Sequence, residues 1–167
     1  MMASQFIERA KVLQDELNTY QTSLNTEVKK QVDTINDLVG KIKDLNREIQ
    51  KYEATGEPAN DYRDKRNEYL DELSQYITFE TNEQPDGTIT IYSEGGYLLD
   101  AVNQYFLTTK YESDTSKLLK PVWETGENYY RYDSLEYSSE NNTDVGGLRG
   151  LLVARGSYAA TYVNVPQ

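Results

Sequence analysis

The stretch that decides the fold is residues 13–52, which read LQDELNTYQTSLNTEVKKQVDTINDLVGKIKDLNREIQKY. Its apolar residues recur mostly at steps of three or four, which is the spacing of a coiled-coil seam. This spacing predicts one long helix over residues 4–54, and about 50 helical residues make a rod of roughly 75 Å. A compact globule of the same mass is only about 30–40 Å across, so the sequence indicates an elongated molecule.

A second, shorter helix is predicted over residues 60–77, after the turn at residues 57–59. A short loop makes consecutive helices antiparallel neighbours, so the two helices are expected to form a hairpin. The second helix is long enough to cover only roughly 25 Å of the first. The N-terminal part of the first helix therefore has no partner in the hairpin, and exposed apolar stripes of this length usually mark contact surfaces. Five residues form this predicted exposed seam: Leu13, Leu17, Leu24, Val28 and Val32.

The composition excludes several classes of function. Among 167 residues there are 28 acidic and 17 basic side chains, a net charge of −11, and neither cysteine nor histidine. Nucleic acids and anionic membrane surfaces attract clustered Lys and Arg, so neither is an expected partner. Without Cys and His there are no disulfides and no His-dependent catalytic triads, and the commonest transition-metal ligand is missing. We therefore expect no catalysis, no cofactor and no metal, and we find no membrane span or cleavable signal peptide in the sequence pattern.

The charge is unevenly distributed and divides the chain into three regions. Residues 1–77 carry 15 acids and 11 bases, whereas residues 78–144 carry 13 acids and only 4 bases. Residues 145–167 have no acid, and a short helix is expected there after a glycine pair. The middle region reads as strands, with Asp86-Gly87 as the turn of a hairpin between alternating apolar and polar residues. The predicted fold class is α+β: a long antiparallel helical hairpin as a stalk, plus a small and mostly antiparallel β domain.

One cluster on the second predicted helix is more informative than the remaining charged residues. Asn60 or Asp61 is expected to cap this helix, and the helix dipole favours the acids of the first turns. Arg66 falls on the apolar face, so its stem can cover apolar surface while its head pairs with an acid of the first helix, Glu48 or Glu53. We call this predicted pairing the hairpin clamp; an Arg-based ligand site is the alternative. The cap and clamp residues are Asn60, Asp61, Asp64 and Arg66.

At these residues the chain resembles the flagellar hook-associated protein 1 family. The resemblance is closest over residues 45–74, which contain Leu45-Asn46, then Ala59-Asn60-Asp61, and then the run Leu70-Asp71-Glu72-Leu73-Ser74. The hairpin at Asp86-Gly87 and the motif of residues 146–152 with a later arginine also agree with the family. Tyrosines replace the more usual leucines at two positions of the second helix. The family continues into long C-terminal helices and also has an N-terminal axial segment, so we expect this chain to be an internal fragment.

The resemblance implies a structural protein outside the cell. In this family the long helices form a stalk, and the β-rich insertion projects outward from it. Export proceeds through the flagellar secretion system without a cleavable signal. The implied partners are other subunits of the same protein, the hook protein, the second junction protein and an export chaperone.

Two other functions remain open from the residues alone. One is a different extracellular coiled-coil module, such as an adhesin or a phage-tail segment, in which the seam joins copies of the chain. The other is a carbohydrate-binding or carbohydrate-cleaving site built from the acids and tyrosines of residues 78–144. Paired carboxylates can do acid–base work on sugars. Most of these acids are expected on exposed faces or turns, however, and most of the tyrosines are expected to pack a small sheet.

Overall fold

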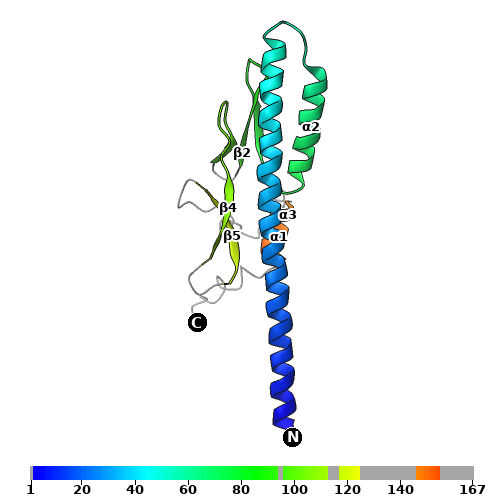
Figure 1. Ribbon diagram of the computed structural model, residues 1–167, viewed down its shortest axis with the longest axis vertical. Coiled ribbons are helices and arrows are strands. Elements are labelled where there is room, and N and C mark those ends of the chain that lie inside the picture. The colour runs from blue at the N-terminus through cyan, green and yellow to red at the C-terminus, as the bar shows by residue number, and fades with distance from the viewer. Residues whose placement is uncertain (1, 94–95, 113–116, 125–145, 155–167) are drawn as a thin grey trace, which may run out of the picture.

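The structure, a computed structural model, describes residues 2–93, 96–112, 117–124 and 146–154. Helix α1 (Met2–Glu53) runs the length of the molecule, and α2 (Asn60–Ser74) lies beside its C-terminal part, as Figure 1 shows. The loop between the helices turns at Gly56, whose φ of 86° lies in the left-handed region that glycine adopts without strain. The α+β fold class and the helical hairpin are confirmed, although α2 ends three residues before the predicted limit.

The strands form two small antiparallel sheets. The first has the order β1 (Glu80–Glu83), β2 (Ile89–Ser93) and β3 (Gly96–Leu99). The second pairs β4 (Leu107–Tyr111) with β5 (Leu119–Trp123). The predicted turn at Asp86-Gly87 connects β1 to β2, with Glu83 opposite Ile89 at its base. The region predicted to form strands extends to residue 144, and its residues 125–144, with a further strand-like piece around residues 129–138, lie outside the described residues.

The helices and the strands share one hydrophobic core. Ile89 and Ile91 of β2 are buried and point to the same side of their strand, as the alternation in the sequence predicts. They belong to the same buried cluster as Val28, Ile35 and Ile42 of α1. Strands β3, β4 and β5 therefore pack directly along α1, and β2 joins the same core through Ile89 and Ile91 (Figure 1). The three-part division of the chain stays a prediction.

A short helix, α3 (Gly147–Ala154), returns to the helical hairpin, as the glycine pair predicts. Its first residues donate backbone hydrogen bonds to the two residues that follow α2. The N–H of Gly147 donates to the carbonyl of Gln75 (2.8 Å), and the N–H of Leu148 donates to the carbonyl of Tyr76 (3.1 Å). A Cβ at Gly146 would lie 2.4 Å from the Tyr76 carbonyl oxygen, so this close approach needs glycine. The helix then lies against α1 below α2 (Figure 1).

Candidate interaction surface

The N-terminal part of α1 has an apolar face that no described element covers. Phe6 is 75% exposed and Leu13 is 65% exposed, although both are large apolar side chains. The exposed apolar residues of this part, which we call the bare stripe, are Phe6, Ile7, Val12, Leu13, Leu17 and Tyr20. Phe6, Leu13, Leu17 and Tyr20 share one face of the helix at steps of three, four or seven residues, and Ile7 and Val12 flank that face on opposite sides. An exposed apolar surface of this kind is typical of a surface that binds another protein segment.

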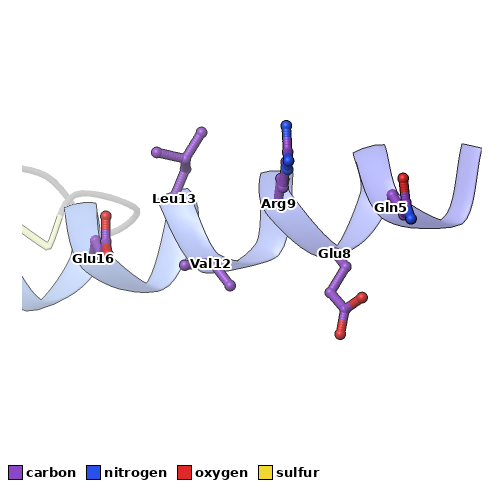
Figure 2. A pocket seen from close by; sticks show the side chains of 6 residues that line it. All are labelled: Gln5, Glu8, Arg9, Val12, Leu13 and Glu16. Carbon is purple, nitrogen blue, oxygen red and sulfur yellow. The ribbon is translucent and has the colours of Figure 1, made fainter. Parts of the chain in front are cut away.

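Charged residues lie between the apolar residues of the bare stripe. Figure 2 shows Arg9 and Leu13 pointing to one side of α1 while Glu8 and Val12 point to the other. All the side chains that line this shallow pocket are exposed, so it is an open helix surface: Gln5, Glu8, Arg9, Val12, Leu13 and Glu16. Apolar residues interleaved with both signs of charge suit packing against another helix.

The predicted exposed seam is wrong at its C-terminal end. Leu13 and Leu17 are exposed, but Leu24 is half-buried, and Val28 and Val32 are 0% and 2% exposed. The reason is that α3 and β5 both pack on this part of α1, and Leu148 and Leu152 of α3 join the same buried cluster. Strand β5 and helix α3 are remote from α1 in the sequence, and the prediction considered only the hairpin of two helices. It therefore assigned no partner to this part of α1.

Arg66 lies on the buried face of α2, as predicted, but its partners differ from the prediction. Its side chain is 3% exposed, and Nη1 donates to Oδ1 of Asn46 (3.0 Å) and to the carbonyl of Gly87 (2.7 Å). Its nearest acid is Glu83 of β1, at 3.8 Å from Nη2, so the predicted pairing with Glu48 or Glu53 is wrong. Burial lowers the pKa of the Arg66 guanidinium, and this side chain joins the helical hairpin to the β1–β2 turn.

Arg63 makes the acid contacts that were assigned to Arg66. Its Nε and Nη2 donate to the two carboxylate oxygens of Glu53 (2.6 and 2.9 Å), and Nη1 donates to Glu83 (2.8 Å). The hydrogen bonds from Arg63 hold the pKa of Glu53 below its ordinary value, and Glu53 in turn raises the pKa of Arg63. Paired N–H donors on one carboxylate fix orientation as well as contributing energy. Arg63 lies one turn from Arg66, and only the fold decides which arginine meets the acid.

Gly87 closes this cluster from the β side. Its φ of 80° is left-handed, and a Cβ there would lie 2.3 Å from Oε2 of Glu53 and 2.9 Å from Cγ2 of Ile49. The preceding Asp86 accepts hydrogen bonds from the Thr88 hydroxyl (2.7 Å) and from Nε2 of Gln50 (2.8 Å), and these keep the pKa of Asp86 below its ordinary value. The turn predicted from Asp86-Gly87 is therefore a docking point on α1.

The predicted side-chain cap of α2 is wrong. The N-cap position is Ala59, which makes no side-chain hydrogen bond, and Asn60 is already the first helical residue. The buried Ala59 leaves the N-cap position without a polar side chain. Asp61 lies in the first turn, where the helix dipole favours it, and Asp64 is exposed.

These contacts connect structural elements. The buried Arg66 and the half-buried Arg63 and Glu53 have partners on α1, α2 and the β1–β2 hairpin. Within the described part of the chain, no group of three acidic side chains is arranged as a metal site. None of the helices described has both the length and the apolar character of a membrane span. The arrangement can hold a rod together and offer one apolar surface to a partner.

Comparisons with known proteins point in the same direction. A family model described as the flagellar hook-associated protein FlgK helical domain matches residues 2–165. Among solved structures, the flagellar hook junction protein FlgK from Burkholderia pseudomallei is similar, with a TM-score of 0.69 and 22% identity over 84% of this chain. The chain spans 25% of the length of that protein, and at this identity the likeness shows a shared fold. No match was found among curated proteins.

Proposed function

The chain belongs to the family of the helical domain of the flagellar hook-associated protein FlgK, and we propose that it is a structural part of the flagellum that joins the hook to the filament. In this proposal it has no catalytic role, is exported without a cleavable signal and works outside the cell. Its partners are other copies of the same protein, the hook protein and the second junction protein, with an export chaperone before assembly. Membership of the family supports the structural role.

The bare stripe carries the proposal at the level of residues. Phe6, Leu13 and Leu17 of α1 are open to solvent. Full burial of a large apolar side chain contributes about 1.5–3 kcal/mol of favourable free energy, so this surface favours binding of a partner. Helices of a stalk bury such stripes against each other. We propose that other helical segments of the assembled flagellum cover the bare stripe. The covered C-terminal half of α1 meanwhile holds the strands in place.

The test uses the bacterium that encodes the chain, with its gene deleted. Deletion should leave hooks without filaments and abolish swimming. A gene carrying Leu13→Glu and Leu17→Glu should fail to restore filaments, because two carboxylates would replace apolar contacts in the stripe. The matched control carries Gln14→Glu and Asn18→Glu, which add the same charge at exposed polar positions of the same turns and should restore swimming.

Electron microscopy of the hooks and the amount of flagellin lost to the medium measure the result. Normal filaments after deletion of the gene would contradict the junction role. Normal filaments with the two leucine substitutions would contradict the role of the bare stripe alone, and would leave the junction role standing.

A further inference from the structure

Three asparagines of α1 each hold the backbone of a different strand. Asn46 donates from Nδ2 to the carbonyl of Ile89 (2.8 Å) and accepts at Oδ1 from the N–H of the same residue (3.2 Å). Asn36 makes the same pair of bonds with Leu107, at 2.8 and 3.0 Å. Asn25 donates to the carbonyl of Lys117 (2.6 Å) and accepts from the N–H of Leu119 (2.9 Å). We call the three side chains the asparagine ladder.

The strand residues in these contacts are all strand beginnings. Ile89, Leu107 and Leu119 are the first residues of β2, β4 and β5. A side-chain amide that donates and accepts together gives the strand what a neighbouring strand's backbone would give it. The three contacts follow α1 from its C-terminal half toward its N-terminus in the order of the strands, and Figure 1 shows β2, β4 and β5 alongside α1 in that order. Each asparagine of the ladder thus contacts its strand at or just before the strand's first residue.

The spacing of the asparagines fits the helix. They are 11 and 10 residues apart, which is close to three helical turns in each case. All three therefore fall within one strip of the α1 surface, which faces the strands. Asn46 is 5% exposed, while Asn36 and Asn25 are half-buried. The contacts thus become more open to water from the α2 end of the rod toward the bare stripe.

Apolar contacts alone would not fix the position of the strands along α1. The buried α1 residues between the rungs are similar in size and recur every turn, among them Val32, Ile35 and Val39. Burial of such residues is not directional, so a slip of the strands by one turn, about 5.4 Å, would retain much of it. A slip would also leave asparagine amides and strand peptide groups without partners, which costs about 1–3 kcal/mol for each buried group. Single polar residues set register in coiled coils by the same means.

We propose that Asn25, Asn36 and Asn46 are positioning residues that set the axial register of the strands on α1. The inference does not rest on the proposed function. It makes a prediction that a purely stabilising role does not make. Replacing a rung by leucine removes the directional bonds and puts an apolar side chain of similar size in place of the amide. The strands should then remain bound to α1 and lose their unique position.

The absence of native cysteine allows the position to be measured with two spin labels in the full chain. One label is attached at the exposed Asp37 of α1 and the other at the exposed Tyr111 of β4, each through an introduced cysteine. Pulsed electron–electron double resonance then measures the distance between the two labels. The unaltered ladder should give one narrow distance distribution. Asn36→Leu should broaden it or add a population displaced by about 5 Å, the rise of one helical turn.

Asn18→Leu is the matched control, because Asn18 is an exposed asparagine of the same helix in its uncovered half. It should leave the distribution unchanged. Asn25→Leu, read with the second label at the exposed Glu124, the residue after β5, tests the most open rung, where the least effect on folding is expected. A single narrow and undisplaced distance in both Asn36→Leu and Asn25→Leu, even with lower melting temperatures, would overturn the proposal. If Asn36→Leu fails to fold, the Asn25→Leu distribution alone decides between the two outcomes.

Discussion

The residues 6–20 and 28–49 belong to one uninterrupted helix, and both parts carry an apolar repeat at helical spacing. In the first part Leu13 is 65% exposed, while in the second part Ile35 is fully buried. The difference comes from the rest of the chain, because α2, α3 and strands β3, β4 and β5 all pack on the C-terminal part of α1. The periodicity of a helix thus predicts that a face will be covered, and the partner elements decide whether it is covered within the same chain.

The sharpest way to break this comparison is to make the same substitution in both parts. Ile42→Ala should lower the free energy of unfolding by about 4 kcal/mol, because Ile42 is fully buried and its loss leaves a cavity. Ile7→Ala removes the same atoms from a side chain that is 55% exposed and should change the free energy by less than about 0.5 kcal/mol. Urea unfolding of the two variants measures the difference. Equal losses would mean that the bare stripe is already covered in solution.

The long helix and the β-hairpin that packs near its C-terminal end could be predicted from the sequence. The point along α1 at which its cover by other elements ends could not. The steps of three and four along residues 13–52 are local and predict α1. Asp86-Gly87 predicts its hairpin because glycine supplies the left-handed φ that the turn needs. The cover over Val28 depends on α3, which is short and more than a hundred residues away. The sequence pattern correctly predicts that Arg66 lies on the buried face of its helix. Its partner, however, is the backbone carbonyl of Gly87, which no pattern of side chains reveals.

A second pair of variants tests whether the β1–β2 turn holds the covered half together. Gly87 and Gly56 both have a left-handed φ, and alanine in that conformation costs about 1–2 kcal/mol. A Cβ at Gly56 meets nothing within 4 Å, whereas a Cβ at Gly87 would displace Glu53 and the Nη2 of Arg63.

Gly56→Ala should therefore lose about 1–2 kcal/mol of stability, and Gly87→Ala about 3 kcal/mol, since forced shifts in a packed site cost about 1–3 kcal/mol. Thermal unfolding gives the order of the two variants. Equal losses would show that the turn rests on α1 without contributing to its stability.

The smallest expected effect is a loss of stability in acid, which comes from a carboxylate among the elements that cover the C-terminal part of α1. Asp100, in the loop between β3 and β4, accepts hydrogen bonds from the N–H of Asn103 (2.6 Å) and from the Tyr105 hydroxyl (2.7 Å). These bonds, that of Asn103 first, lower the pKa of Asp100 to about 2. A carboxyl with a depressed folded pKa stabilises the protein above its unfolded pKa of about 4, and that contribution is lost as the pH falls from about 4 to about 2.

Because Asp100 is only half-buried and solvent screens its charge, the contribution is expected to be about 1 kcal/mol or less. The single tryptophan, Trp123 of β5, reports unfolding of the covered half by its fluorescence in urea at each pH. The Asn103 N–H and the Tyr105 hydroxyl donate to different oxygens of Asp100. Asp100→Asn keeps one oxygen, which can accept from the Asn103 N–H, and places an amide nitrogen that cannot titrate toward the Tyr105 hydroxyl. The stability of this variant should therefore fall less steeply between pH 4 and pH 2. Identical slopes for the two proteins would assign the acid dependence to other carboxylates that tie the cover to α1, Glu53 and Asp86 first.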